Sequence, residues 1–311
     1  MKKRALGNSD LTIAPLVLGG NVFGWTADEP TSFDILDAFV DAGGTMIDSA
    51  DVYSAWAPGH SGGESETVIG NWLKRDPAKR DKVLIATKVG FFEGLAPEKV
   101  LQAADASLAR LGIDRIDLYY QHKDDESVPL ADSFGAFDQL RKAGKIDAIG
   151  LSQYSADRVR EAIQVADAQG YARPSVLQTW YNLVERKKLE GPLLDAALEH
   201  GLGILPFYSL ANGFLTGKYR SADDLGKSVR GMRNIDYLEG RGPRVLAALD
   251  EIAAETGAAL ATVALAWTKA QPGITAPIAS ATSLDQARDL LAALTMELTA
   301  AQIERLNEAS D

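Results

Sequence analysis

Four polar residues of this sequence could together donate a proton to a carbonyl oxygen. Asp48 and Tyr53 follow one short apolar run, Lys88 ends the next, and His122 follows a third. A tyrosine hydroxyl has a pKa of about 10, which is too high for easy proton release at neutral pH. A lysine ammonium beside it would lower that pKa, and an aspartate would hold the ammonium in place and keep it charged.

The histidine and the tyrosine would divide the work on a bound carbonyl group. His122 can hydrogen-bond the carbonyl oxygen, and Tyr53 can give that oxygen a proton as hydride reaches the carbon. The sequence has no cysteine and no metal-ligand spacing, so we expect neither thiol chemistry nor a metal. Each residue alone has a plain structural explanation, such as a solvated lysine. Their joint placement after successive apolar runs favours the catalytic interpretation.

Short apolar runs alternate with amphipathic helical patterns along the chain, which indicates parallel strands buried on both faces and covered by helices. The predicted strands are Ala14–Leu18, Thr45–Ile47, Val83–Thr87, Ile116–Tyr120, Ile146–Leu151, Val176–Thr179, Gly203–Phe207 and Ile274–Ile278. The helical patterns include Pro30–Ala42, Glu64–Lys74, Pro97–Leu111, Pro129–Ala143, Ala156–Gln169 and Pro192–Glu199. Eight such units predict the α/β class and a single (β/α)8 barrel domain over residues 1–311.

The alternative fold is a doubly wound open sheet. It would need a G-x-G-x-x-G fingerprint after the first strand, and Gly19–Gly24 does not fit that pattern. Local signals add detail to the barrel: Thr31 and Ser32 are expected to start the first helix, and Ser155 to start the fifth.

Two further segments have predicted places in the barrel. Residues Arg4–Ile13 resemble a hairpin with its turn at Asn8–Asp10, which would plug the bottom of the barrel. The polar segment Tyr219–Gly242 follows the seventh predicted strand and is rich in arginine. A long loop without regular structure at this position predicts an active-site lid.

Composition limits the partners that this chain can have. A net charge of −11 argues against a nucleic-acid surface, which needs clustered lysine and arginine. No apolar run approaches the length of a membrane span, and Met1–Arg4 is not followed by the apolar run of a signal peptide. We expect a cytoplasmic protein, a monomer or weak homo-oligomer, that acts on a small molecule.

At this point the sequence resembles the aldo-keto reductase family, and the resemblance covers essentially the whole chain. Met46–Tyr53 resembles the family's first signature, and Glu64–Gly70 resembles the segment that opens its second helix. Ile85–Lys88 and Asp117–His122 carry the lysine and the histidine. The resemblance implies that Tyr53 is the general acid, that Lys88 and Asp48 tune it, and that His122 orients a carbonyl or alcohol substrate.

The resemblance also implies a nicotinamide cofactor. Members of the family usually use NADP(H), and NAD(H) is the alternative. The nicotinamide would be held by Ser152, by Gln153 where the family usually has asparagine, and by Gln178, with Phe207 stacked on the ring and Tyr208 beside it. The remaining implied cofactor contacts are Gly20, Asn21, Asp48, Ser209, Leu210, Gly213, Lys218, Ser280, Thr282, Ser283, Gln286 and Arg288. Many NADP-preferring members carry a cation around Ser280 to Gln286, whereas here Arg288 is the nearest one.

Aromatic residues near the expected mouth suggest an apolar or flat carbonyl substrate. Phe23, Trp25 and Trp56 are the candidate substrate contacts, and Phe91, Phe92 and Tyr154 lie in neighbouring loops. Two other functional classes remain open. One is a cofactor-binding regulatory subunit of the kind found with potassium channels. The other is a barrel isomerase acting on a phosphorylated sugar, although Ser280–Ser283 offers only a modest phosphate site.

Overall fold

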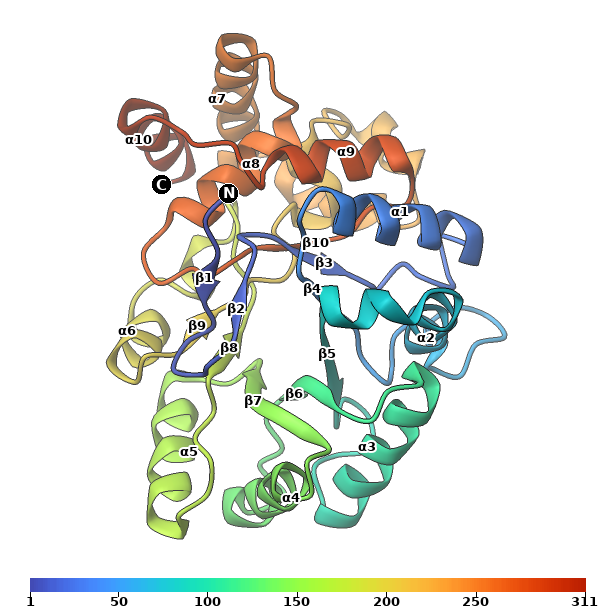
Figure 1. Cartoon of the computed structure of the whole chain (residues 1–311). Coiled ribbons are helices and arrows are strands. Elements are labelled where there is room, and N and C mark those ends of the chain that lie inside the picture. Colours follow the sequence, from blue (N-terminus) through green and yellow to red (C-terminus); the bar gives the residue numbers. More distant parts are fainter.

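The computed structural model describes all residues 1–311 and contains a cylinder of parallel strands surrounded by helices (Figure 1). The eight strands of the main sheet follow one another in chain order, as predicted. They are β3 (Val17–Gly19), β4 (Met46–Asp48), β5 (Leu84–Val89), β6 (Ile116–Gln121), β7 (Ile146–Ser152), β8 (Val176–Gln178), β9 (Gly203–Ile204) and β10 (Ile278–Ala279).

The sheet closes on itself between its last two strands. β10 pairs with β3 in parallel, and Ile204 of β9 forms a parallel bridge with Ile274. The backbone N–H of Thr275 donates to the oxygen of Ile204 at 2.9 Å. These contacts confirm the predicted (β/α)8 barrel over the open sheet.

Helices cover the outside of the barrel. They are α1 (Glu29–Asp41), α2 (Glu64–Arg75), α3 (Pro97–Leu111), α4 (Leu130–Lys142), α5 (Ala156–Gln169), α6 (Pro192–Glu199), α7 (Arg241–Thr256), α8 (Leu260–Ala270), α9 (Leu284–Ala292) and α10 (Ala300–Ser310). None is long and apolar enough to cross a membrane.

Helix α1 begins at Glu29, one residue before the predicted Pro30, but its start signal was assigned to the wrong residues. Asp28, not Thr31 or Ser32, is the N-cap, because its side chain accepts a 3.0 Å hydrogen bond from the N–H of Thr31. Ser155 caps α5 as expected, accepting from the N–H of Arg158.

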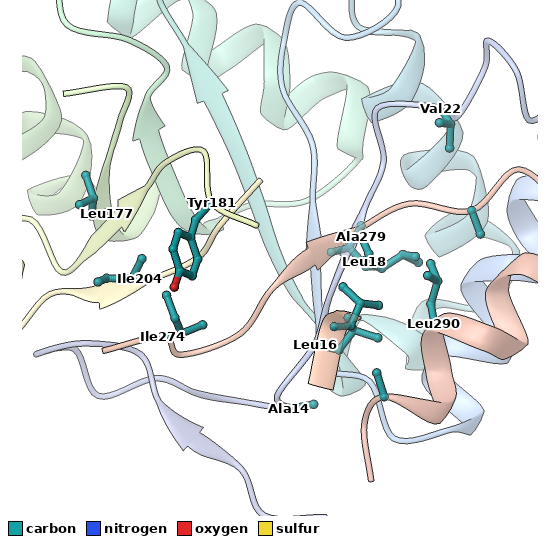
Figure 2. Close-up of a cluster of buried hydrophobic side chains, with 14 of the residues drawn as sticks. Ala14, Leu16, Leu18, Val22, Leu177, Tyr181, Ile204, Ile274, Ala279 and Leu290 are labelled. Carbon is teal, nitrogen blue, oxygen red and sulfur yellow. The ribbon is translucent and has the colours of Figure 1, made fainter. Parts of the chain in front are cut away.

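The hydrophobic core has two layers. The larger one lies between the strands and the helices; Figure 2 shows Leu18 and Ala279 of the sheet near Leu290 of α9. The smaller one fills the barrel itself and includes Leu6 and Ile13 of the N-terminal hairpin. The hairpin therefore belongs to the inner core.

That hairpin is built from β1 (Arg4–Ala5) and β2 (Thr12–Ile13), which pair antiparallel. Gly7 in its turn has φ +59°, and a Cβ there would lie only 1.9 Å from the backbone oxygen of Ser175. Glycine thus lets the turn press against the start of β8 (Figure 1). This close approach closes the bottom of the barrel, as predicted.

The segment after β9 is more ordered than the sequence suggested. We predicted Tyr219–Gly242 to be structureless, but it holds the short 3-10 helices η4 (Ala222–Lys227) and η5 (Gly231–Leu238). Tyr219 and Leu225 are buried, and their burial explains why this polar stretch takes a defined shape. We refer to residues 219–242 as the lid.

Candidate active site

The candidate catalytic side chains continue the inward-facing rows of the barrel strands. Side chains two positions apart on a strand face the same way. Met46 and Ala86 belong to the inner core, so Asp48 and Lys88, two residues further along, also face inward. His122 directly follows β6. The structure brings these side chains to the carboxyl end of the barrel, where parallel-barrel enzymes carry their active sites.

Lys88 is the centre of this group. Its Nζ donates to Asp48 Oδ2 at 2.6 Å, to the backbone oxygen of Ser49 at 2.7 Å and to the Tyr53 hydroxyl at 2.8 Å. The Lys88 and Asp48 side chains are 0% and 2% exposed, so neither charge is screened by water. Three acceptors fix the ammonium group and direct one of its protons at Tyr53. Sequence reasoning missed the part played by the Ser49 carbonyl.

The electrostatics of Tyr53 differ from the sequence expectation. We predicted that Lys88 would lower the pKa of Tyr53. Burial, reinforced by Asp48, instead raises the pKa of Tyr53 well above its usual value of 10. Burial also lowers the pKa of Lys88, against the attraction of Asp48. The cost of removing charge from water outweighs the single lysine contact, and Tyr53 stays a protonated phenol.

His122 is a neutral imidazole at neutral pH. Burial, together with the nearby charges of Lys88 and Lys123, lowers the pKa of His122 well below its usual value of 6.5. Its ring centroid lies 6.1 Å from that of Tyr53 and 4.9 Å from that of Phe91. The Nδ1 atom has no protein partner. A neutral ring of this kind can donate one hydrogen bond to a ligand without supplying charge.

The predicted nicotinamide-binding amides have protein partners of their own. Gln178 Nε2 donates to Asp48 Oδ1 at 2.9 Å, which holds the aspartate from its other side. Gln153 has φ +57° and donates to the backbone oxygen of His122 at 3.0 Å. Ser152 ends β7 and is 1% exposed. This contact connects Gln178 to the candidate catalytic residues through Asp48, which the sequence did not reveal.

A tight left-handed turn follows β9 and contains several of the predicted cofactor contacts. Ala211, Asn212 and Gly213 have φ values of 47°, 53° and 93°. A Cβ on Gly213 would lie 3.0 Å from the Lys218 Nζ, so the ammonium group rests against this turn. The Asn212 Oδ1 is buried without a partner. The Lys218 ammonium group, the unpaired Asn212 side chain and a turn without side chains in the way could together bind a diphosphate group. The residues present therefore fit a dinucleotide.

The opposite end of the predicted cofactor site holds no free cation. Ser280 donates to Asn21 Oδ1 at 2.6 Å, and Gln286 Oε1 accepts from the N–H of Thr282 at 3.0 Å. Arg288 is 72% exposed and forms an ion pair with Asp285 at 2.7 Å. Its charge is therefore already compensated. Ser283 serves as the N-cap of α9.

The aromatic residues divide into those that line the mouth and one that does not. Phe23 is fully buried in the larger core layer, whereas the predicted substrate contacts Trp25 and Trp56 are not. Trp25 and Trp56 have ring centroids 5.5 Å apart, and Trp56 lies 6.0 Å from Tyr53. The sequence analysis missed Trp180, whose ring centroid lies 5.0 Å from that of Tyr208. It could have been found, because Trp180 lies two residues after the inward-facing Gln178 and residues two apart on a strand face the same way.

Surface hollows lie at both ends of the barrel. The larger, about 1210 Å³, is at the amino ends of the strands and is lined by polar residues such as Arg80 and Asp117. A smaller one of about 400 Å³ borders the mouth and includes Gln153, Trp180 and Phe207. Only the mouth brings proton donors and aromatic rings together, so we place the candidate active site there.

The sequence is similar to known proteins over nearly its whole length. The sequence profile described as "Aldo/keto reductase family" matches residues 15–311. The chain is 32% identical to "Uncharacterized oxidoreductase YrpG" of Bacillus subtilis over 99% of this chain and 95% of that protein. It is 29% identical to "NADH-specific methylglyoxal reductase" of Escherichia coli, over 100% and 99%. A "Probable voltage-gated potassium channel subunit beta" of Arabidopsis thaliana is 30% identical, over 94% and 91%.

Proposed function

The chain belongs to the aldo/keto reductase family, and we propose that residues 1–311 act as one unit that reduces an aldehyde or ketone to an alcohol. The observation that carries this proposal is the 2.8 Å contact between the buried Lys88 Nζ and the Tyr53 hydroxyl. A protonated phenol at the mouth, beside a neutral imidazole, can supply a proton to a carbonyl oxygen. The protonated form of Tyr53 serves the reduction, and the reverse oxidation of an alcohol would use its phenolate as the proton acceptor.

The side chains would act in a fixed order. His122 donates a hydrogen bond to the carbonyl oxygen and orients it, while the aromatic side chains around the mouth exclude water. A bound dihydronicotinamide would supply hydride to the carbonyl carbon. Tyr53 gives its proton to the oxygen, and the phenolate left behind is stabilised by the Lys88 ammonium. Asp48, held by Gln178, keeps that ammonium charged and in place.

The cofactor would extend across the mouth between two loop regions. Ser152, Gln153 and Gln178 would contact the nicotinamide, and Phe207 or Tyr208 would stack against it. The turn at Ser209–Gly213, with Lys218, would hold the diphosphate. Gly20, Asn21, Ser280, Thr282, Ser283 and Gln286 would lie along the remainder.

We expect weak discrimination between NADPH and NADH. A 2′-phosphate is best held by an arginine or lysine, and Arg288 is already paired with Asp285. The ratio of kcat/KM for the two cofactors should stay below about a thousandfold, or about 4 kcal/mol. Arg288→Met should hardly change the ratio, whereas Gln286→Arg should raise the preference for NADPH. A larger wild-type ratio, or its collapse in Arg288→Met, would contradict this assignment.

Loss of cofactor absorbance with a panel of aldehydes and ketones tests the proposed reductase directly. We expect turnover with at least one carbonyl compound. The similarity to a channel subunit favours one alternative, a regulatory protein that binds cofactor with little turnover. Tight cofactor binding without oxidation by any carbonyl compound would favour that alternative.

A further inference from the structure

A buried serine at the start of helix α2 bonds to residues that follow two barrel strands. Ser65 is the second residue of α2, whose N-cap is Gly63. A serine near a helix start ordinarily accepts a hydrogen bond from the N–H groups of its own helix. Ser65 instead donates its hydroxyl proton to the backbone oxygen of Gly20 at 2.8 Å, 45 residues away in the sequence. Its hydroxyl group therefore connects the helix to the end of β3.

Ser65 also contacts Ser49, and the direction of that hydrogen bond is fixed. The two Oγ atoms lie 2.9 Å apart, and both residues are fully buried. A hydroxyl group has one proton, and the proton of Ser65 goes to Gly20. Ser49 must therefore donate and Ser65 accept. The bonds run in one direction from Ser49 through Ser65 to Gly20, and each polarises the next.

These contacts close a hydrogen-bonded ring formed by Gly20, Asp48, Ser49 and Ser65. The Gly20 N–H donates to the backbone oxygen of Asp48 at 2.7 Å, and a peptide bond joins Asp48 to Ser49. A Cβ on Gly20 would lie 2.8 Å from the Ser65 Oγ and 3.2 Å from the backbone oxygen of Asp48, so glycine permits this close approach. The hydrogen-bonded ring thus fixes the backbone of Asp48 and Ser49 against the end of β3.

Asp48 and Ser49 supply two of the three acceptors of Lys88. The Lys88 Nζ donates to Asp48 Oδ2 at 2.6 Å and to the backbone oxygen of Ser49 at 2.7 Å. Its third acceptor is the Tyr53 hydroxyl. A rotation of the peptide that joins Asp48 to Ser49 would move both of the other acceptors together. Ser65 is therefore placed to hold the lysine in position without touching it.

The start of α2 is also anchored by contacts that do not involve the Ser65 hydroxyl. Glu66 accepts from Thr87 Oγ1 at 2.5 Å and forms an ion pair with Arg110 at 2.6 Å. Both Glu66 and Thr87 are fully buried. These contacts should keep the helix in place when the hydroxyl is removed. A substitution at Ser65 therefore tests the hydrogen-bonded ring and not the position of the helix.

We propose that Ser65 is a positioning residue, whose hydroxyl fixes the Asp48–Ser49 backbone that directs Lys88 at Tyr53. The inference rests on the proposed reductase function and adds a residue outside the four catalytic side chains. Ser65 touches neither the substrate nor the reacting atoms. It also fixes Gly20, one of the expected cofactor contacts, so a single hydroxyl group aligns the proton donor with the cofactor.

Ser65→Ala leaves the Gly20 oxygen and the Ser49 hydroxyl without their partner. In this variant kcat should fall about tenfold, the scale of one net hydrogen bond, while KM for the carbonyl substrate changes less than about twofold. Ser133→Ala is the matched control, because Ser133 is 2% exposed and donates its hydroxyl to the backbone oxygen of Leu130 within α4. The control should keep the wild-type kcat. Circular dichroism checks that both variants retain the fold. An unchanged kcat in Ser65→Ala, or equal losses in both variants, would overturn the proposal.

A double mutant tests whether the two serines act together. Ser49→Ala removes the hydroxyl that donates to Ser65. If both act through the hydrogen-bonded ring, the loss of kcat in Ser49→Ala/Ser65→Ala should be clearly smaller than the product of the two single losses. A loss equal to that product would show that the serines act separately and would overturn the hydrogen-bonded ring as the cause.

A measurement on the cofactor-free protein separates this proposal from the reductase claim. NMR of protein labelled with ¹³C at the lysine Cε atoms follows the titration of Lys88, and Lys88→Met identifies its signal. Burial lowers the pKa of Lys88, against the attraction of Asp48. Acceptors that are held in place favour the charged ammonium, so Ser65→Ala should move the titration midpoint to lower pH by about one unit. The carboxylates that act on Lys88 are those of Asp48, Asp51 and Glu66, and the variant retains all three.

The two claims then fail differently. An unchanged titration of Lys88 in Ser65→Ala would overturn the positioning role even if the enzyme is active. A shifted titration in a protein that reduces no carbonyl compound would overturn only the reductase function.

Discussion

Replacing Tyr53 with phenylalanine should reduce kcat for carbonyl reduction by about a thousandfold or more, the range expected for loss of a positioned general acid. Phenylalanine keeps the ring against Trp56 but removes the hydroxyl that Lys88 contacts at 2.8 Å. His122 is the only other group proposed to donate a hydrogen bond to the carbonyl oxygen. Its imidazole is neutral, and a neutral imidazole is too weak an acid to replace Tyr53 as the proton donor.

Cofactor affinity provides the internal control for this variant. The dissociation constants for NADPH and NADH should stay within a few-fold of wild type, because the proposed cofactor contacts do not include Tyr53. Tyr171→Phe is the matched change on the outside of the barrel, where the hydroxyl faces Gly135 of α4, and should leave kcat intact. Wild-type turnover in Tyr53→Phe would refute the proposed proton donor.

Replacing Asp51 with asparagine should stabilise the protein at alkaline pH. Burial, reinforced by the neighbouring charge of Glu66, raises the pKa of Asp51 from 3.8 to about 7. Its Oδ1 is buried and has no hydrogen-bond partner. Between these two pH values the folded protein binds a proton at Asp51 that the unfolded chain has released, so wild-type stability falls as pH rises through this window. Asparagine removes that dependence.

Denaturant unfolding at pH 5 and pH 8 checks the expectation. The stability of Asp51→Asn relative to wild type should rise by about 3 kcal/mol between these two values, since one pKa unit corresponds to about 1.4 kcal/mol. The contributions of titrating groups that do not interact with Asp51 cancel in that difference. Asp157→Asn, a change at a fully exposed side chain, should behave as wild type at both pH values. A pH-independent difference for Asp51→Asn would show that this carboxylate is not strained by burial.

Much of the fold could be predicted from the sequence because each strand is a compact apolar run bounded by helices. The short runs that became β4 and β5 already carried Asp48 and Lys88 at their ends. Closure of the barrel was harder to predict, since it depends on the pairing of Ile204 with Ile274, which are separated in the chain by α7 and α8. The order of the lid depends on the burial of Tyr219 and Leu225, which local polarity conceals.

The site was predicted in parts. Placement at strand ends identified the residues that meet around Lys88, because strand geometry directs them inward. Partners that come from distant parts of the chain were not predictable: Gln178 on Asp48 and Ser65 on Gly20 depend on how separate segments fold together. Trp180 could have been predicted, since side chains two apart on a strand face the same way and Gln178 faces inward. The pKa of Tyr53 depended on burial, which motif spacing does not report.

Transfer of deuterium from a nicotinamide cofactor labelled at its transferable position tests the central claim most directly. Mass spectrometry of the alcohol formed by the wild-type protein should find one deuterium on the former carbonyl carbon for each cofactor oxidised. Tyr53→Phe should bind the labelled cofactor yet form almost no labelled alcohol. Alcohol without deuterium, or label transfer at the wild-type rate in Tyr53→Phe, would contradict the proposed reduction.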